Sequence, residues 1–305
     1  VRYGHAYCVA MIGLVPGAKP EPASTQNATV QIFGERAGAI SFLVDGAENN
    51  DPVTGGPQVR FTQDSIQEFD VMTTGYEAEF GRAQGGVANI ITRSGTNEFD
   101  GRAFWFLRDD QFDTANVPDQ DPPALNRDQW GGTLGGPIVR EHAFFFGSFE
   151  KLDEQRGVNI QQSRIPAFVR AGLATPGGEE DFQIAPETDG FTGLGKVDFN
   201  LNVDHRLTAT VNRSQQDVTG EISSPVAGTT ALPSAARTET REGTSAVFRH
   251  SAVFSQSTFL ESTGTWIDGL SGNNLDETIR AEPILTLLLT GFVQSATQLY
   301  VLRFL

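Results

Sequence analysis

Residues 61–101 read RFTQDSIQEFDVMTTGYEAEFGRAQGGVANIITRSGTNEFDG, and this stretch decides the fold. Two short β-prone runs, 66–72 and 87–93, alternate in it with Gly-rich loops, and a Ser-Gly-Thr-Asn turn ends the second run. From Glu98 onward the pattern changes to longer segments separated by long polar loops. The change predicts a small N-terminal domain at residues 9–98 and a second, mainly β domain at residues 99–305.

The clearest periodicity lies in two neighbouring segments, 196–203 and 205–214. Apolar and polar residues alternate in both, which predicts two antiparallel strands that meet in a tight turn at Asp204. The alternation fits a soluble β-sandwich as well as a membrane barrel wall whose apolar face meets lipid. If the segments belong to such a wall, one set of side chains points to lipid: Val197, Phe199, Leu201, Leu207, Ala209 and Val211.

The connections between the predicted strands fall into two classes. Further strands are predicted at 101–108, 128–138, 142–151, 190–195, 243–254 and 257–267. Between them lie long polar loops at 109–127, 152–189 and 215–242. Short turns that alternate with long loops are typical of outer-membrane barrels and unusual in a compact soluble domain. The longest uncharged run, 283–302, is solidly apolar only over 284–293, which is too short for a transmembrane helix.

Composition excludes several classes of function. The formal net charge of −16 argues against a nucleic-acid partner, which would require clustered Lys and Arg. Cys8 is the only cysteine, so neither an intrachain disulfide nor a CxxC zinc site is possible. The four histidines lack metal-ligand spacing, and no nucleophile elbow, phosphate loop or dinucleotide fingerprint occurs. The sequence therefore predicts no catalytic residue, no cofactor and no metal.

Three stretches carry a family resemblance. Residues 61–101 are followed by DQWGGTLGGPI (128–138) and AFFFGSFEK (143–151). In this order they resemble the plug domain and first barrel strands of TonB-dependent outer-membrane receptors, most closely the Oar-like group. The resemblance runs from Leu43 to Ser214. It implies a mainly β fold, in which a small mixed α/β plug domain at 9–98 precedes antiparallel strands of an incomplete outer-membrane β-barrel at 99–305.

The resemblance also implies a set of plug residues. VAMIGLVPG (9–17) resembles the short helix and PG turn that open the plug, and Arg82 resembles a plug arginine that faces the wall and pairs with its carboxylates. Asp45, with Glu48, Asn50 and Asp51, has the oxygen atoms of a calcium loop but lacks the terminal Glu, so a solvated turn is expected there. The complete plug motif implied by the resemblance is Asp45, Gly46, Arg82, Gly85, Gly86, Asn89 and Gly95.

The functional expectation follows from the family. A TonB-dependent receptor lies in the outer membrane, contacts lipid, binds a ligand outside the cell and is driven by the inner-membrane TonB complex; it is not an enzyme. Siderophore, glycan, peptide and exported protein all stay open as ligands. Because the chain begins with Val and residues 283–305 lose the family texture, we expect a fragment without signal peptide, TonB-contact segment and C-terminal strands. The alternative is a secreted or surface β-sandwich that binds glycan or protein without transport.

Overall fold

A computed structural model gives the fold. It describes residues 12, 15–20, 30–32, 34–35, 39–51, 55–76, 83–110, 125–159, 183–221, 237–255, 258–273, 279–293 and 296–304. Regular structure in these residues is almost entirely β, as predicted. None of their helical segments is long and apolar enough to cross a membrane. Most of the helix expected at 9–17 lies outside the described residues.

The N-terminal part contains a four-stranded sheet, here called the small sheet. Its order is β4 (Ala47–Glu48), β3 (Ile40–Val44), β6 (Gly86–Thr92) and β5 (Ile66–Met72). β3 and β6 run parallel, whereas the other pairs are antiparallel. The 3-10 turn η1 (Gln63–Ser65) precedes β5. All five side chains of β3 are buried, which suits a central strand that is covered on both faces.

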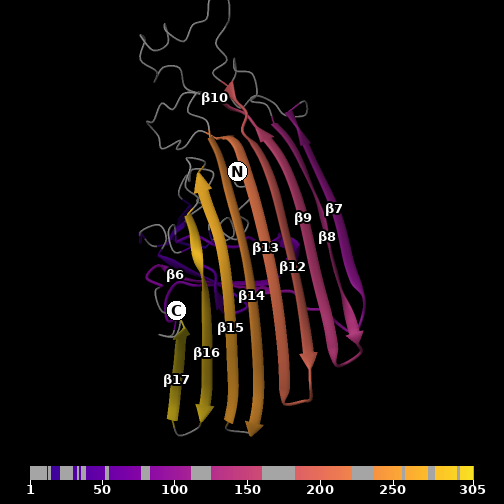
Figure 1. Cartoon of the computed structure of the whole chain (residues 1–305), viewed down its shortest axis with the longest axis vertical. Coiled ribbons are helices and arrows are strands. Elements are labelled where there is room, and N and C mark those ends of the chain that lie inside the picture. Colours follow the sequence, from indigo (N-terminus) through magenta and orange to yellow (C-terminus); the bar gives the residue numbers. More distant parts are fainter. Residues whose placement is uncertain are drawn as a thin grey trace, which may run out of the picture.

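The C-terminal part is one large sheet, here called the wall. Its order is β7 (Asp100–Asp109), β8 (Leu125–Val139), β9 (Ala143–Arg156), β12 (Glu187–Asn200), β13 (His205–Glu221), β14 (Arg237–Ser255), β15 (Thr258–Asn273), β16 (Ile279–Val293) and β17 (Ala296–Phe304). Every neighbouring pair is antiparallel. Within the described residues this nine-stranded sheet is open, with β7 and β17 at its edges. Figure 1 shows the long strands side by side as a curved surface.

Two further pairs of short strands complete the described β structure. β1 (Ala18–Pro20) pairs with β2 (Val30–Ile32), and β10 (Val158–Asn159) pairs with β11 (Gln183–Ile184). The first pair lies beside the small sheet, since Ile32 joins Ile40 and Phe42 in one apolar cluster. The second pair extends the connection between β9 and β12.

The wall strands are longer than the sequence predicted. The segments expected at 190–195 and 196–203 are one strand, β12, and the turn after it spans Leu201–Asp204 rather than Asp204 alone. Within this turn Val203 is 98% exposed, and the Asn202 side chain accepts hydrogen bonds from the amides of Asp204 and His205. Leu201 follows the alternation in the sequence but lies in the turn rather than on the apolar face, because β12 ends at Asn200.

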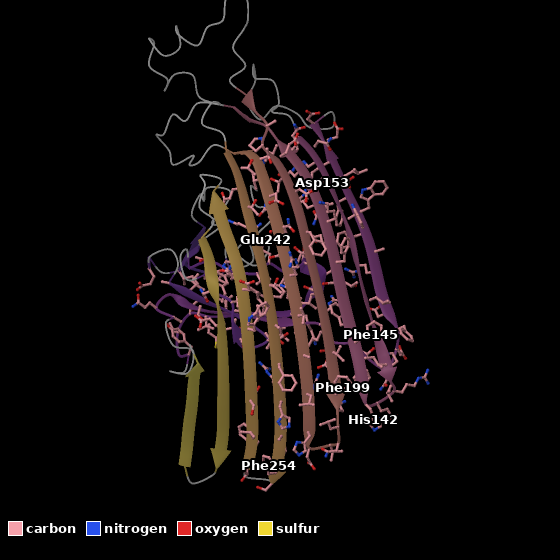
Figure 2. The ribbon with its side chains drawn as sticks, in the orientation of Figure 1. His142, Phe145, Asp153, Phe199, Glu242 and Phe254 are labelled. Carbon is pink, nitrogen blue, oxygen red and sulfur yellow. The ribbon has the colours of Figure 1, made fainter. Side chains whose placement is uncertain are left out.

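The two faces of the wall differ in chemistry. Inner-face residues such as Asp198, Thr210 and Asn212 are buried, and the small sheet lies against this face (Figure 2). Alternate residues point the opposite way. Phe199 is 41% exposed and Val211 53% exposed on the outer face. The apolar set within the strands therefore shares the outer face, away from the small sheet, and its contact with lipid stays a prediction.

Apolar packing holds the small sheet together but contributes little to its contact with the wall. One cluster packs Ile12, Ile32, Ile40, Phe42 and Ala88 on the side of β3 and β6. A second cluster packs Val44, Phe61 and Ile90 against Phe146 of β9 and Leu194 of β12. Among the described wall residues, only these last two belong to a buried apolar cluster. Most of the contact between the two sheets must therefore be polar.

Candidate functional site

The candidate site is the polar contact between the small sheet and the wall. It begins at the turn between β3 and β4, where Asp45 has φ 48° and Gly46 has φ 78°. Two successive positive φ values define the type I′ hairpin turn, for which Asp-Gly is a favoured sequence. The expectation of a solvated turn is wrong for Asp45, which is only 8% exposed because this turn points into the wall. The side chain of Asn50, which follows β4, accepts from the Phe42 amide at 2.8 Å and donates to the Ile40 carbonyl oxygen at 2.9 Å.

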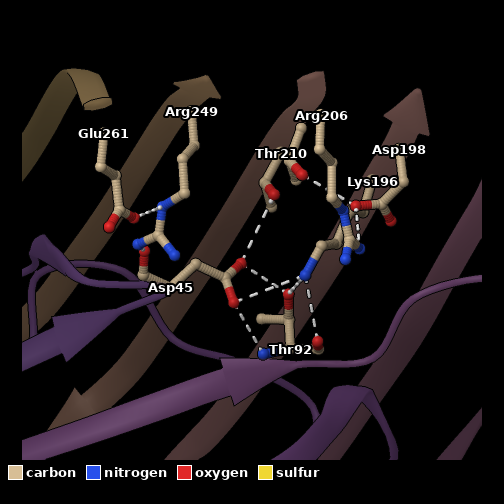
Figure 3. Close-up of polar contacts among 9 residues, drawn as sticks. Asp45, Thr92, Lys196, Asp198, Arg206, Thr210, Arg249 and Glu261 are labelled. Carbon is tan, nitrogen blue, oxygen red and sulfur yellow. Dashed lines mark hydrogen bonds and ion pairs between the residues drawn. The ribbon is translucent and has the colours of Figure 1, made fainter. Parts of the chain in front are cut away.

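Asp45 joins both sheets through its carboxylate. One oxygen, Oδ1, accepts from the Thr92 amide at 2.9 Å, and the other, Oδ2, accepts from the Thr92 hydroxyl at 2.6 Å. From the wall, Lys196 Nζ lies 3.5 Å from Oδ1 and the Thr210 hydroxyl donates to Oδ2 at 3.4 Å (Figure 3). Lys196 also donates to the Thr92 carbonyl oxygen at 3.1 Å and to its hydroxyl at 3.0 Å. We call Asp45, Thr92, Lys196 and Thr210 the Asp45 cluster.

Further ion pairs flank the Asp45 cluster (Figure 3). Arg249 of β14 donates to the backbone carbonyl oxygen of Asp45, and its Nε lies 3.2 Å from a Glu261 oxygen of β15. Asp198 accepts from Arg206 at 2.9 Å and from the Thr208 hydroxyl at 2.8 Å.

Charge is balanced across this region, because each cation has a carboxylate partner. Glycine is favoured at position 46 because φ there is 78°, and a Cβ atom would also displace the Arg249 guanidinium group.

A second contact lies where the loop before η1 meets β13, β14 and β15. The Arg60 amide donates to the Ser214 hydroxyl at 3.1 Å, and the Asn212 side chain donates to the Arg60 carbonyl oxygen at 2.8 Å. Gly243 and Gly269 are directly opposite each other on β14 and β15, and both face Gln58. The missing side chains leave a notch in the wall that Gln58 fills; we call it the glycine notch.

A third contact joins the small sheet to the first wall strands. Arg102 of β7 forms an ion pair with Asp64 of η1 at 2.8 Å. The hydroxyls of Thr62 and Ser148 lie 3.3 Å apart. Gly95, between β6 and β7, lies so close to the Phe145 carbonyl oxygen that a Cβ atom would not fit. The three contacts therefore hold the small sheet along most of the width of the described wall.

The structure separates the residues of the predicted motif. Asp45, Gly46 and Gly95 lie at the contact with the wall. Gly86 and Asn89 lie in β6 of the small sheet, where Gly86 has φ 134° and faces the Met72 carbonyl oxygen. Gly85 directly precedes β6, and its amide donates to the Ala39 carbonyl oxygen at 3.0 Å. Arg82 lies outside the described residues.

Sequence reasoning missed the wall partners Lys196, Thr210 and Arg249. In the sequence, Lys196 and Thr210 stand out only as polar members of two alternating strands. One signal could have found them: the polar positions of an alternating wall strand face inward, and a buried charge there needs a partner.

The comparisons with known proteins agree with this architecture. Residues 91–192 match the family model described as an outer membrane beta barrel domain. Over 218 residues the chain is 29% identical to the TonB-dependent transporter Oar of Myxococcus xanthus. This match covers 65% of this chain and 20% of that protein. The chain is therefore similar to the TonB-dependent receptors of the outer membrane.

Solved structures show the same fold for this chain. The outer membrane transporter YddB from Escherichia coli superimposes with a TM-score of 0.64 at 9% identity, covering 92% of this chain and 42% of that chain. The siderophore receptor PirA from Acinetobacter baumannii superimposes with a TM-score of 0.56 at 17% identity, and the match covers 93% of this chain and 42% of that chain. The chain thus spans about a fifth of its curated relative and under half of each of these structures. All three relatives are named as transporters or receptors, not as enzymes.

The outer face of the wall matches a lipid environment. Trp130, Phe149 and Phe191 form a row of aromatic contacts with ring centroids 5.2 and 5.3 Å apart. Lys151 is directly opposite Trp130 and Phe191 on the two neighbouring strands, and it is paired with Asp189. Aromatic and charged side chains that meet at one level of the strands mark the boundary between lipid and water in outer-membrane barrels. The apolar band therefore ends on these strands near Phe149 and Phe191.

Proposed function

We propose that this chain forms the plug and part of the barrel wall of a transporter that moves an unidentified ligand across the outer membrane. Residues 9–98 act as the plug and residues 99–305 contribute to the wall. The inner-membrane TonB complex supplies the energy by pulling on the plug, and the lipid of the outer membrane surrounds the apolar face. The ligand changes place without the making or breaking of a bond, so the chain is not an enzyme.

The polar contact between the small sheet and the wall is the observation that supports this proposal best. A hydrogen bond contributes only about 0.5–1.5 kcal/mol net, because water replaces the lost partner when the groups separate. An apolar contact of the same extent would resist separation by about 25 cal/mol for each Å² exposed. The Asp45 cluster, the Arg60 contacts and the glycine notch therefore suit a plug that stays in place at rest and leaves under a pull.

A reversible covalent tether tests whether the plug must move. The hydroxyls of Thr62 and Ser148 are 3.3 Å apart, so Thr62→Cys with Ser148→Cys places two thiols within reach of a disulfide. The whole transporter carries this pair in a Cys8→Ser background, and each single Cys variant is the matched control. The readout is the set of molecules whose distribution between periplasm and medium differs between the wild-type and the deletion strain.

The expected result is that the oxidised tether reproduces the distribution of the deletion strain. Reducing the disulfide should restore the wild-type distribution, and inactivating the TonB complex should change the same set of molecules. Transport that continues with a fully formed tether would refute a moving plug. If inactivation of the TonB complex leaves the distribution of these molecules unchanged, energy coupling is refuted.

A further inference from the structure

Two histidines on the outer face of the wall contact each other directly. His205 Nδ1 and His250 Nε2 are 3.1 Å apart, on the neighbouring strands β13 and β14. His250 is directly opposite Leu207, so it lies on the same outer face as Leu207 and His205. Neither ring takes part in the contact with the small sheet. This histidine pair is therefore independent of the function proposed above.

The rings meet edge to edge. Their planes differ by 11° and their centroids are 5.4 Å apart, whereas the facing nitrogens are only 3.1 Å apart. The difference is about the width of one ring, so both nitrogens must lie near the line between the centroids. Each lone pair or N–H group then points at the other ring. In the absence of another ligand, a single proton bridges the two nitrogens as an N–H···N hydrogen bond.

The neighbours of the pair hold it in place. The ring of Phe254 meets His205 edge-on, with centroids 5.8 Å apart and planes 83° apart. The Asn202 side chain accepts from the His205 amide at 2.8 Å, which fixes the start of β13. The Asp204 carbonyl oxygen accepts from the Val253 amide at 2.9 Å, which fixes β14 beside it. Phe254 lies at the end of the wall that carries the short turns, so water reaches this site (Figure 2).

We propose that His205 and His250 bind one divalent transition-metal ion of the kind that prefers imidazole, such as Zn²⁺. Zinc–nitrogen bonds of about 2.0–2.1 Å place two nitrogens on the same ion roughly 3–3.4 Å apart, and the observed separation falls in this range. To bind the ion, the ring that donates the N–H···N hydrogen bond moves that proton to its own outer nitrogen by exchange with water. Both rings stay neutral, with protons on His205 Nε2 and His250 Nδ1, and both facing lone pairs are free. Each ring also turns by roughly 40°, because an ion about 2.0–2.1 Å from both nitrogens lies off the line between them.

Water completes the coordination of the ion. The described residues contain no group of three or more His, Cys, Asp or Glu side chains arranged for a metal. The pair is therefore a two-ligand site with open positions. Such a site binds an ion reversibly, unlike a closed four-ligand structural zinc site.

Zinc titration of the whole chain tests the proposal. The chain is purified in detergent without a histidine tag, and ZnCl₂ binding is followed by calorimetry. One equivalent should bind to the wild type, and His205→Gln or His250→Gln should each weaken binding by about tenfold or more, since one of two ligands is lost. His142→Gln is the matched control, because His142 lies at the same end of the wall, where its Nδ1 contacts only the Arg140 carbonyl oxygen.

A second measurement uses the wild type alone, so a folding defect of a variant cannot affect it. Diethyl pyrocarbonate modifies histidines, and mass spectrometry reads each site. Zinc should protect His205 and His250 in the wild type but leave His142 reactive. Equal modification with and without zinc, or zinc binding unchanged in both Gln variants, would overturn the proposal and leave the pair as a proton-sharing hydrogen bond only.

Discussion

Lys196 provides most of the positive charge that stabilises the carboxylate of Asp45 inside the contact. The Lys196 side chain is 7% exposed and that of Asp45 9% exposed, so both have lost nearly all their hydration. Thr92 and Thr210 supply hydroxyls that satisfy the remaining hydrogen-bonding positions. Removal of one partner from a buried ion pair leaves an uncompensated charge. This destabilises the folded state much more than removal of both partners.

Lys196→Met should therefore loosen the small sheet. We expect a cost of roughly 3–5 kcal/mol, the usual penalty for breaking a buried ion pair. In a Cys8→Ser background, Ser65→Cys reports opening through its rate of reaction with a maleimide, since Ser65 is fully buried. The rate should rise by about two orders of magnitude or more.

Two controls accompany this measurement. Lys151→Met removes an ion pair on the outer face and should change the rate by less than about tenfold, since exposed pairs contribute at most about 1 kcal/mol. Combining Asp45→Asn with Lys196→Met should recover part of the loss. Equal rates for Lys196→Met and Lys151→Met would contradict a stabilising role of the Asp45 cluster.

Sequence reasoning located Asp45 but not its partners. The Asp-Gly dipeptide identifies the turn, because two positive φ values favour these residues. The distance in sequence is what hides the contact: Lys196 lies 151 residues after Asp45, and Arg249 lies 204 residues after it. Only the packing of one sheet on another brings them together. The alternation of β12 and β13 showed which residues share a face, but not what covers that face.

At the scale of elements, β12 and β13 present one face to lipid and one to the small sheet. Cys replacements should report this difference. Cys at 197, 199, 207, 209 and 211 should react with lipid-phase probes, whereas Cys at 198 and 210 should resist both lipid-phase and aqueous probes, because both positions are almost fully buried. Cys at 201 and 203 should react with aqueous probes, since these residues form the turn. Lipid-phase labelling at 198 or 210 would reverse the assignment of the two faces.

The glycine notch gives a second test at this scale. Gly243→Ala should disturb the loop at Gln58 more than Gly269→Ala, because the new methyl group meets the Gln58 carbonyl oxygen at 2.9 Å rather than a side-chain end that can move. Overpacking typically costs about 1–3 kcal/mol. Hydrogen exchange of residues 55–65, followed by mass spectrometry, should accelerate by roughly 5- to 100-fold.

Gly195→Ala is the matched control for the notch, since nothing lies within 4 Å of the added Cβ atom. Its exchange rates should match those of the wild type. If Gly243→Ala behaves like this control, Gln58 is not held by the wall.

Strand ends were the least predictable part of the wall. Alternation marks a strand only where one face is apolar, and it fades beyond the lipid band, where both faces are polar. β13 continues to Glu221 and β14 starts at Arg237, although both ends had been assigned to a loop. The last two strands, β16 and β17, went unrecognised because their apolar residues follow one another without alternation.

At the scale of the whole molecule, the described sheet is open and apolar on its outer face. Large side chains on that face, such as Trp105, Leu134 and Phe248, are 67, 53 and 51% exposed. Unpaired strand edges and exposed apolar patches both promote association in water. We therefore expect the chain by itself to form aggregates in plain buffer and to disperse only in detergent, as measured by size-exclusion chromatography with light scattering. A monodisperse soluble monomer that unfolds cooperatively would instead favour a surface β-sandwich.

The composition of the inner face has a consequence for permeation. Where the small sheet lies, the wall carries hydroxyls and amides: Ser148, Thr210, Asn212, Ser214, Thr263 and Thr265. A pore lined with apolar side chains can close by dewetting, whereas a lining of hydroxyls and amides keeps its water. Any lumen uncovered by movement of the small sheet would hydrate at once and stay wet. Inorganic ions should pass through it together with the ligand, so each transport event should carry a brief electrical current.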